Sequence, residues 1–174
     1  SSSQYDGVVV IGSGLISPST LKVMPMNSFN LHLGLSPRYR GSATLFWPSY
    51  FLEPEFSGLT LHRFAPSPDA GPIVHQTSLT WRNTDWNLHE SACETVLQGL
   101  VEIGQVLNTA FSNRKIETRK QPAVGKTFLV SDFRVEHLEQ VYDLYGGKII
   151  HHVVNELGRP IKKPRLFKAN MENL

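Results

Sequence analysis

A short alternating segment that runs directly into a loop constrains the fold of this chain more than any other feature. Residues 28–33 read Ser-Phe-Asn-Leu-His-Leu, so apolar residues separate Asn30 from His32 and flank both. Because the side chains of a β-strand alternate between its two faces, this pattern predicts a strand with one apolar and one polar face. Glycines and a proline over residues 34–41 predict a loop immediately afterwards. An amide and an imidazole are therefore expected together at the carboxyl end of a strand, where open α/β sheets bind ligands.

The composition is that of a folded domain and excludes several classes of protein. The chain has 174 residues, of which 40% are hydrophobic and 18% charged, and these values are typical of globular domains. A net charge of +2 argues against a nucleic-acid partner. No apolar stretch approaches the ~20 residues of a membrane span, so no membrane partner is expected. Cys93 is the only cysteine, which excludes an internal disulfide and favours the reducing cytoplasm.

The first part of the sequence predicts a parallel strand–helix–strand unit. Residues 8–11 are a continuous apolar run, which is typical of a strand covered on both faces. Pro18 begins a short predicted helix that extends to residue 24, with Ser17 as its N-cap. The strand of residues 28–33 follows, and this order of elements favours right-handed parallel pairing.

An aromatic segment and a β-hairpin are expected next. Ser42 is a candidate N-cap for a helix, and Pro48 requires this helix to be kinked or to begin late. Its aromatic residues are expected in the core rather than against a substrate: Phe46, Trp47 and Tyr50. Residues 58–64 and 72–79 predict two strands, which the turn-rich loop 65–71 joins as a hairpin.

A long amphipathic helix is predicted over residues 85–111, with Thr84 as its N-cap. Its apolar stripe recurs every three or four residues: Leu88, Ala92, Val96, Leu100, Ile103, Leu107 and Phe111. Cys93 lies on the flank of this stripe and is expected to be buried and inert.

Shorter elements are predicted in the C-terminal part. Residues 126–130 fit a short strand, and residues 134–145 fit a helix that the following Gly-Gly pair ends. Residues 149–154 fit either a strand or a helix, because their periodicity does not decide between the two. The tail over residues 158–174 contains prolines and basic residues and is expected to be extended or loosely held.

Three motifs occur in a fixed order along the chain: Asn30-x-His32, Leu35-Ser-Pro-x-Tyr39-Arg40-Gly41 and Asp69-Ala-Gly-Pro-Ile73. With this order and spacing, residues 6–111 resemble the folate-dependent formyltransferases, a family that includes glycinamide ribonucleotide formyltransferase, methionyl-tRNA formyltransferase and the sugar N-formyltransferases. The branch that acts on amino sugars or similar small amines is most similar in two segments: Phe46-Trp47-Pro48 and Phe128-Leu-Val-x-Asp132-Phe133.

The resemblance implies an α/β fold. Residues 1–111 would form the C-terminal part of an incomplete Rossmann-like formyltransferase domain, a mixed sheet with flanking helices, and residues 112–174 would form a short C-terminal α/β extension. The family has a further strand–helix–strand unit before the position of residue 6, and this sequence does not contain it. The strand of residues 8–11 is therefore expected at or near an exposed sheet edge.

The resemblance also implies an enzyme that moves a formyl group from 10-formyltetrahydrofolate to the amine of a small substrate, plausibly a nucleotide-linked amino sugar. Such a transfer passes through an oxyanion, and losing one hydrogen-bond donor to it typically costs ~3–4 kcal/mol. By resemblance Asn30 holds the formyl oxygen, and His32 stabilises the charge or relays a proton. Asp69 orients His32 or acts as the base, and its charge is expected to favour protonated His32.

Further residues are assigned to ligands on the same basis. The turn that contains Gly12, Ser13, Gly14 and Ile16 resembles the part of the family site that lines the pterin pocket, where glycines permit a close approach. The candidates for substrate binding are Arg38, Tyr39 and Arg40. The two arginines either bind a substrate phosphate or are solvated loop charges, and a structural or mixed role is favoured for Arg40.

Partners and metals are less constrained. No metal site is predicted, because the remaining histidines lack ligand spacing; His151 and His152, for example, would diverge on a strand. A homo-oligomer is plausible, since residues 112–174 contain apolar material that a partial sheet would not cover.

Departures from the family pattern keep other functions open. His32 is followed by Leu33-Gly34 where many members have Pro-Ser, and Pro66 stands where many carry an acidic residue. These differences, with the absent first unit, favour a non-catalytic fragment or pseudo-enzyme that acts as a binding or structural module. A hydrolase of the same folate would need the same three residues, so the sequence leaves that activity open as well.

Overall fold

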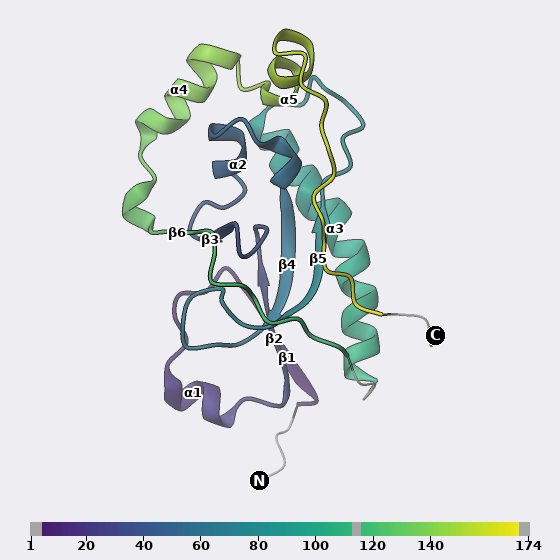
Figure 1. Ribbon diagram of the computed structural model, residues 1–174. Coiled ribbons are helices and arrows are strands. Elements are labelled where there is room, and N and C mark those ends of the chain that lie inside the picture. The colour runs from purple at the N-terminus through teal and green to yellow at the C-terminus, as the bar shows by residue number, and fades with distance from the viewer. Residues whose placement is uncertain (1–4, 113–115, 171–174) are drawn as a thin grey trace.

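A mixed four-stranded sheet organises the molecule (Figure 1). The structure is a computed structural model, and it describes residues 5–112 and 116–170. The strand order is β1-β2-β4-β5, and the strands are β1 (Gly7–Ile11), β2 (Asn27–His32), β4 (Gly58–Arg63) and β5 (Ile73–Ser78). β1 and β2 are parallel, whereas β2, β4 and β5 are successively antiparallel. The predicted α/β class with a mixed sheet is confirmed, as are the parallel unit and the hairpin.

The helix that links the parallel strands forms as its capping signals predict. α1 (Pro18–Val23) begins with Pro18, and the Ser17 hydroxyl accepts a hydrogen bond from the Thr20 N–H at 3.1 Å. Pro satisfies the first helical position because its missing N–H would have no intrahelical partner there. Within the described residues β1 pairs with β2 alone, so the expected position of this apolar strand at a sheet edge is confirmed.

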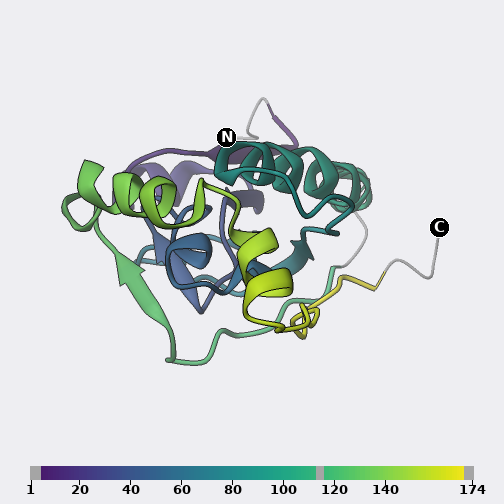
Figure 2. The same cartoon turned by 90° about the horizontal axis from the view of Figure 1, so that it is seen from above.

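One face of the sheet is covered by the long helix α3 (Leu88–Phe111). Figure 2 shows α3 along one side of the molecule, with the segment that leads to β6 on the other side. The core between helix and sheet contains Phe29, Leu31, Leu59, Leu61, Val74, Ile103 and Val106. The alternation of β2 thus places its apolar side chains against α3 and leaves the polar side chains on the opposite face.

Three expectations for α3 are corrected. The N-cap is Asn87 rather than Thr84: its side chain accepts from two backbone N–H groups, and the Glu90 carboxylate accepts from the Asn87 N–H, which completes a capping box. The buried stripe is rotated from the predicted one and includes small residues such as Gly99, while Leu100 is exposed. Cys93 was expected to be buried but is exposed, because this rotation turns it toward solvent.

A second core is mainly aromatic and connects the two ends of the chain. The strands β3 (Tyr39–Gly41) and β6 (Lys126–Phe128) form a parallel ribbon. α2 (Trp47–Tyr50) and α4 (Val135–Tyr145) pack beside it. Trp47 stacks on Phe128 with ring centroids 4.6 Å apart, which confirms Trp47 as core, whereas Phe46 is buried and also lines a cavity. The helix starts at Trp47, so Pro48 falls in its first turn, the alternative in which the helix begins late.

The C-terminal part ends in helical turns and an extended tail. α5 (Ile149–His151) continues into the π-helical turn η3 (His152–Glu156), so residues 149–154 are helical rather than a strand. Short 3₁₀ turns occupy η1 (Pro54–Phe56) and η2 (Val130–Asp132). Gly146 adopts a left-handed conformation, φ +57°, and ends α4 as predicted. Among the described residues, no helix has both the length and the apolar character to cross a bilayer.

Candidate active site

The face of the sheet opposite α3 carries a row of polar side chains. Strand pairing places Asn30 directly opposite His62, and His32 directly opposite Thr60. His32, Thr60 and His62 are all nearly fully buried. Polar groups are tolerated at such positions only when they are hydrogen-bonded, so this row requires partners from outside the sheet.

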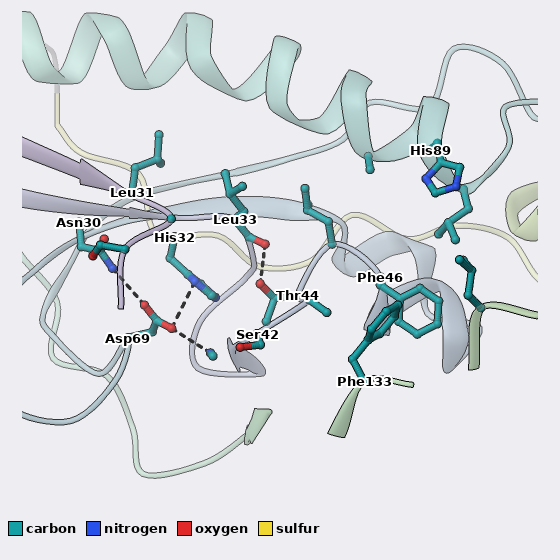
Figure 3. A pocket seen from close by; sticks show the side chains of 18 residues that line it. Asn30, Leu31, His32, Leu33, Ser42, Thr44, Phe46, Asp69, His89 and Phe133 are labelled. Atoms are coloured by element: carbon teal, nitrogen blue, oxygen red, sulfur yellow. Dashed lines mark hydrogen bonds and ion pairs between the residues drawn. The ribbon is translucent and has the colours of Figure 1, made fainter. Parts of the chain in front are cut away.

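The main partner is the carboxylate of Asp69, which comes from the loop between β4 and β5 (Figure 3). Its Oδ1 accepts from Asn30 Nδ2 at 3.0 Å and lies 3.4 Å from His62 Nε2. Its Oδ2 accepts from the Gly41 N–H at 2.8 Å and lies 3.3 Å from His32 Nδ1. The structure therefore brings the three predicted catalytic residues Asn30, His32 and Asp69 together from two separate segments.

These contacts determine the charge of Asp69. Burial raises the pKa of the carboxyl, but His62, His32 and the Gly41 N–H together lower it more, so that the pKa lies below its ordinary value. Asp69 is consequently a carboxylate at neutral pH, and two N–H donors, Asn30 Nδ2 and the Gly41 backbone, hold its anionic form in position.

His32 is neutral and has a defined tautomer. Its Nε2 lies 2.9 Å from the Tyr39 carbonyl oxygen, and because a carbonyl can only accept, Nε2 carries the proton. Burial lowers the pKa of His32, and the opposing effect of the Asp69 charge is smaller. The expected effect of Asp69 is present, since its charge raises the pKa of His32, but desolvation outweighs it and the net shift is downward. The unprotonated Nδ1 faces Asp69 Oδ2, so Nδ1 can accept one proton and then donate it in a hydrogen bond to the carboxylate.

His62 is a member of this cluster that the sequence analysis missed. Its Nδ1–H donates to the Arg63 carbonyl at 2.7 Å, which leaves Nε2 as an acceptor 3.1 Å from Asn30 Nδ2. The two N–H groups of Asn30 are thus directed at Asp69 and His62. The missed signal was the alternation Leu-Thr-Leu-His over residues 59–62, which places His62 on the polar face of a strand paired with the Asn-x-His strand.

Two cavities meet at this cluster. A larger one of about 510 Å³ is lined by His32 and extends between α3 and the aromatic core, toward Phe46 and Phe133 in Figure 3. A smaller one of about 310 Å³ is lined by His62 and the loop 64–69. Both cavities share five residues: Ser13, Asn30, Gly41, Ser42 and Asp69. The site thus offers two compartments with a common boundary at the Asn30–Asp69 pair.

The residues predicted to line the pterin pocket lie beside the same cluster. Gly14 and Ile16 line the smaller cavity, Gly12 lines the larger one, and Ser13 lines both. Gly12 has a φ of +62°, which turns the chain at the end of β1 in a conformation that favours glycine.

The residues predicted to bind substrate are not brought to this site. Arg38 forms a bidentate ion pair with Glu53 and lies over the Phe56 ring at 4.3 Å. The Tyr39 side chain is buried and donates its hydroxyl proton to Glu53 Oε2 at 2.5 Å. Arg40 lines neither cavity. Tyr39 instead supports the site through its backbone carbonyl, which fixes His32. The sequence did not identify Glu53 as the residue that binds the Arg38 and Tyr39 side chains outside the candidate site.

The departure at Gly34 has a structural explanation. A Cβ atom at this position would lie 2.6 Å from the Thr44 Cβ and 2.7 Å from His32 Nε2. The absent side chain lets Thr44 approach closely enough to donate its hydroxyl proton to the Leu33 carbonyl at 2.6 Å. A glycine after the Asn-x-His strand therefore accommodates the loop that encloses the imidazole.

Comparison with known proteins identifies the fold. No protein-family model matches the chain. It is similar to the formyltransferase PseJ from Anoxybacillus kamchatkensis, whose structure was solved in complex with UDP-4,6-dideoxy-4-formamido-L-AltNAc and tetrahydrofolate. The two sequences are 20% identical, and the structures align with a TM-score of 0.65 over 84% of this chain and 76% of that chain. A 4-N formyltransferase from Francisella tularensis is 21% identical, with a TM-score of 0.63 over 75% of this chain and 52% of that chain.

A third similar structure is WlaRD, a sugar 3N-formyltransferase solved with dTDP and 5-N-formyl-THF, which is 25% identical with a TM-score of 0.55 over 63% of this chain and 40% of that chain. The chain thus spans about half or less of the length of the last two structures. These similarities show that the chain has the fold of the sugar N-formyltransferases, which confirms the fold that the sequence motifs implied.

Proposed function

We propose that this protein is an N-formyltransferase that moves a formyl group from 10-formyltetrahydrofolate to the amine of a small substrate, most suitably a nucleotide-linked amino sugar. The observation that carries the proposal is the position of Asn30 and Asp69 at the boundary between two cavities, with His32 beside them in the larger one. Transfer between two substrates requires that both reach one set of catalytic groups, and the shared boundary provides that place. The bound ligands of PseJ and WlaRD support the choice of donor and acceptor.

The smaller cavity suits the pterin of the donor. Its walls combine the turn over residues 13–16 with apolar side chains such as Phe64, Pro66 and Phe128, a lining that fits a flat heteroaromatic ring. The larger cavity suits the acceptor, because it reaches His32 and is otherwise mainly apolar. No lysine or arginine lines the larger cavity, so a sugar ring with few hydroxyl groups fits it better than a phosphate does.

Three groups carry the proposed chemistry. The acceptor amine must lose a proton, and the unprotonated Nδ1 of His32, backed by the carboxylate of Asp69, is the base that takes it. Asn30 Nδ2 donates to the formyl oxygen as negative charge develops on it. To do so Asn30 must give up one present contact, and the neutral contact to His62 is weaker than the charge-assisted one to Asp69. The proton is then returned to the folate nitrogen that leaves.

A transferase assay tests this proposal directly. The purified chain is incubated with 10-formyltetrahydrofolate and a UDP- or dTDP-linked 4-amino-4,6-dideoxysugar, and the formamido product is measured by mass spectrometry. We expect His32→Ala to lower kcat/KM by about 10²–10⁴-fold, while His151→Ala, which changes a half-buried histidine outside both cavities, leaves it unchanged. Equal activity of the His32 variant and the unaltered chain would reject the assignment.

The same assay separates the alternatives. Formate release without acceptor, at a rate that acceptor does not change, would favour the hydrolase. Tight binding of a folate analogue without turnover of either kind would favour the non-catalytic module.

A further inference from the structure

A third cavity, distinct from the two at the candidate site, has the character of an anion-binding site. It measures about 210 Å³ and is lined by residues from the β2–β3 loop, the segment 119–122 and the C-terminal tail. We call it the basic groove and define it by its four cationic residues, Arg38, Arg119, Lys120 and Arg165. No aspartate or glutamate is among its lining residues.

Most of the positive charge in the basic groove is uncompensated. Arg38 is paired with Glu53, but the side chains of Arg119, Lys120 and Arg165 have no hydrogen bond or ion pair with any residue in the described part of the chain. Two of these residues come from the segment before β6 and one from the tail, so the fold gathers cations from distant parts of the sequence into one concave surface. Like charges that converge without a counter-charge are more stable when an anion is bound between them.

A buried hydroxyl at the groove supplies an independent indication of a ligand. Ser36 lines the groove, is 2% exposed, and its Oγ is buried without a hydrogen-bond partner. Both backbone groups of Ser36 are engaged: its N–H donates to Thr60 Oγ1 at 3.0 Å, and its carbonyl accepts from Gln76 Nε2 at 2.6 Å. The residue is therefore held in place while its hydroxyl remains unsatisfied. A buried unsatisfied polar group costs about 1–3 kcal/mol, which an oxygen of a ligand would relieve.

From these two observations we infer that the basic groove binds a small, multiply charged oxyanion, either a phosphate group or a polycarboxylate. The arginine and lysine side chains provide charge-assisted donors, and the Ser36 hydroxyl provides a neutral one. The volume is below the roughly 300–1,000 Å³ of pockets for drug-sized ligands, so the anion is compact rather than a whole nucleotide. Apolar side chains such as Phe56 and Leu166 complete the walls.

The basic groove is attached to the loop of the candidate active site. The backbone of Arg119 pairs with that of Ile73 in both directions, at 2.7 and 2.8 Å. Gln121 Nε2, two residues later, donates to the carbonyls of Asp69 and Gly71 at 2.8 and 2.7 Å. An anion held by Arg119 and Lys120 would thus fix the same segment that holds the Asp69 loop.

Isothermal titration calorimetry of the full chain in a phosphate-free, low-salt buffer tests the inference. Pyrophosphate and citrate are titrated separately, so that the two sources of oxyanion are distinguished. We expect one saturable site for at least one of them, and a Lys120→Gln/Arg165→Gln variant to bind it about tenfold or more weakly. The matched control is Lys162→Gln/Lys163→Gln, which removes the same charge from exposed tail residues that do not line the groove and should keep the affinity.

A second variant addresses the hydroxyl. Ser36→Ala removes an unsatisfied group, so we expect a melting temperature equal to or above that of the unaltered chain, together with weaker anion binding. Three results would overturn the inference: no saturable binding of either anion, equal losses in the two double variants, or unchanged binding in Ser36→Ala. None of these measurements uses formyl transfer, so the inference and the proposed function fail independently.

Discussion

Asp69 has a backbone φ of +47°, a left-handed conformation that Asn and Asp tolerate better than other side chains. Asparagine is therefore the substitution that removes the charge while it retains the backbone. We expect Asp69→Asn to stay folded and to lower kcat/KM by about 100-fold or more, because the proton on His32 Nδ1 would lose its carboxylate partner. Circular dichroism checks the fold and the transferase assay checks the rate. An active Asp69→Asn enzyme would mean that the carboxylate only shapes the loop.

The pH dependence of the same reaction follows from the direction of the His32 shift. Because burial lowers the pKa of His32, the base form that we propose as active persists below the ordinary value of 6.5, and kcat/KM should decline only at more acidic pH. The Asp69 charge raises the pKa of His32, so its removal should move the acidic limb to still lower pH. Profiles of kcat/KM for the unaltered chain and Asp69→Asn measure this movement. A limb that moves to higher pH would contradict the assignment of His32 as the base.

We expect His62 to act through Asn30 rather than on the acceptor, and kinetics can show this. In His62→Phe the amide of Asn30 loses the acceptor at 3.1 Å that holds its rotation until the formyl oxygen takes over this N–H. We expect kcat to fall by about tenfold while KM for the acceptor changes little, since His62 does not line the larger cavity. His62→Gln, which keeps a side-chain acceptor, should recover part of the loss. A rise in acceptor KM with unchanged kcat would instead indicate a role in binding.

Among single residues, the sequence identified those whose positions follow from local periodicity. The period of two over residues 28–33 is enough to place Asn30 and His32 on one face. The positions of His62 and Glu53 depend on partners from other segments, through strand register in one case and loop packing in the other. Neither partner lies within the window that a local pattern covers, so His62 was missed and Arg38 was assigned to a substrate instead of to Glu53.

Among the elements, α3 shows where a hydrophobic pattern misleads. The predicted stripe followed large apolar side chains, but the helix approaches the sheet most closely through small residues. At Gly99 an added Cβ would lie 2.5 Å from Leu59 Cδ1 and 2.6 Å from Thr77 Oγ1. The Asn87-x-x-Glu90 capping box can be identified from the sequence alone. The close approach of the helix to the sheet at a glycine cannot, because it depends on which residues of the sheet lie opposite that glycine.

The glycines of α3 give a matched pair of substitutions. Leu59 and Thr77 are almost completely buried and cannot move away, so Gly99→Ala should destabilise the fold by about 1–2 kcal/mol even after the gain in helix propensity. Gly104 is exposed on the same helix and has no atom within 4 Å of an added Cβ, so Gly104→Ala should stabilise it by about 0.5–1 kcal/mol. Urea denaturation measures both. Equal effects at the two positions would show that α3 does not pack on the sheet through Gly99.

Across the whole molecule, the C-terminal tail joins the ends of the fold. Phe167 and Gln76 exchange two hydrogen bonds, of 2.8 and 3.1 Å, and Ala169 contributes to the core beneath α3. The sequence predicted a tail that is either extended or loosely held. Its extension followed from prolines and charges, but its attachment to β5 is a long-range pairing that composition does not reveal. The segments on either side of residue 111 consequently share both cores.

His75 makes this attachment sensitive to pH. Its Nδ1 accepts from the Ala169 N–H at 3.0 Å, and its Nε2 lies 3.0 Å from Glu102 Oε2, which also pairs with Lys168. Burial lowers the pKa of His75, and the Lys168 charge lowers it further, while Glu102 raises it by less than these two together. Protonation at Nδ1 would replace the acceptor that holds the tail with a donor. The neutral form of His75 is thus the one compatible with the closed tail.

The consequence for stability has a defined sign. A histidine with a lowered pKa in the folded state takes up its proton more readily when unfolded, so its contribution is present above pH 6.5 and is lost as the pH falls from 6.5 through the folded-state value. His32 contributes in the same direction.

We expect the melting temperature to fall between pH 7 and pH 5, and His75→Gln to reduce this slope without abolishing it, because His32 remains. Hydrogen exchange adds a local test, since the Ala169 amide should lose protection on acidification before the amides of β2 and β4 do; simultaneous loss would show that the tail is not held independently by His75.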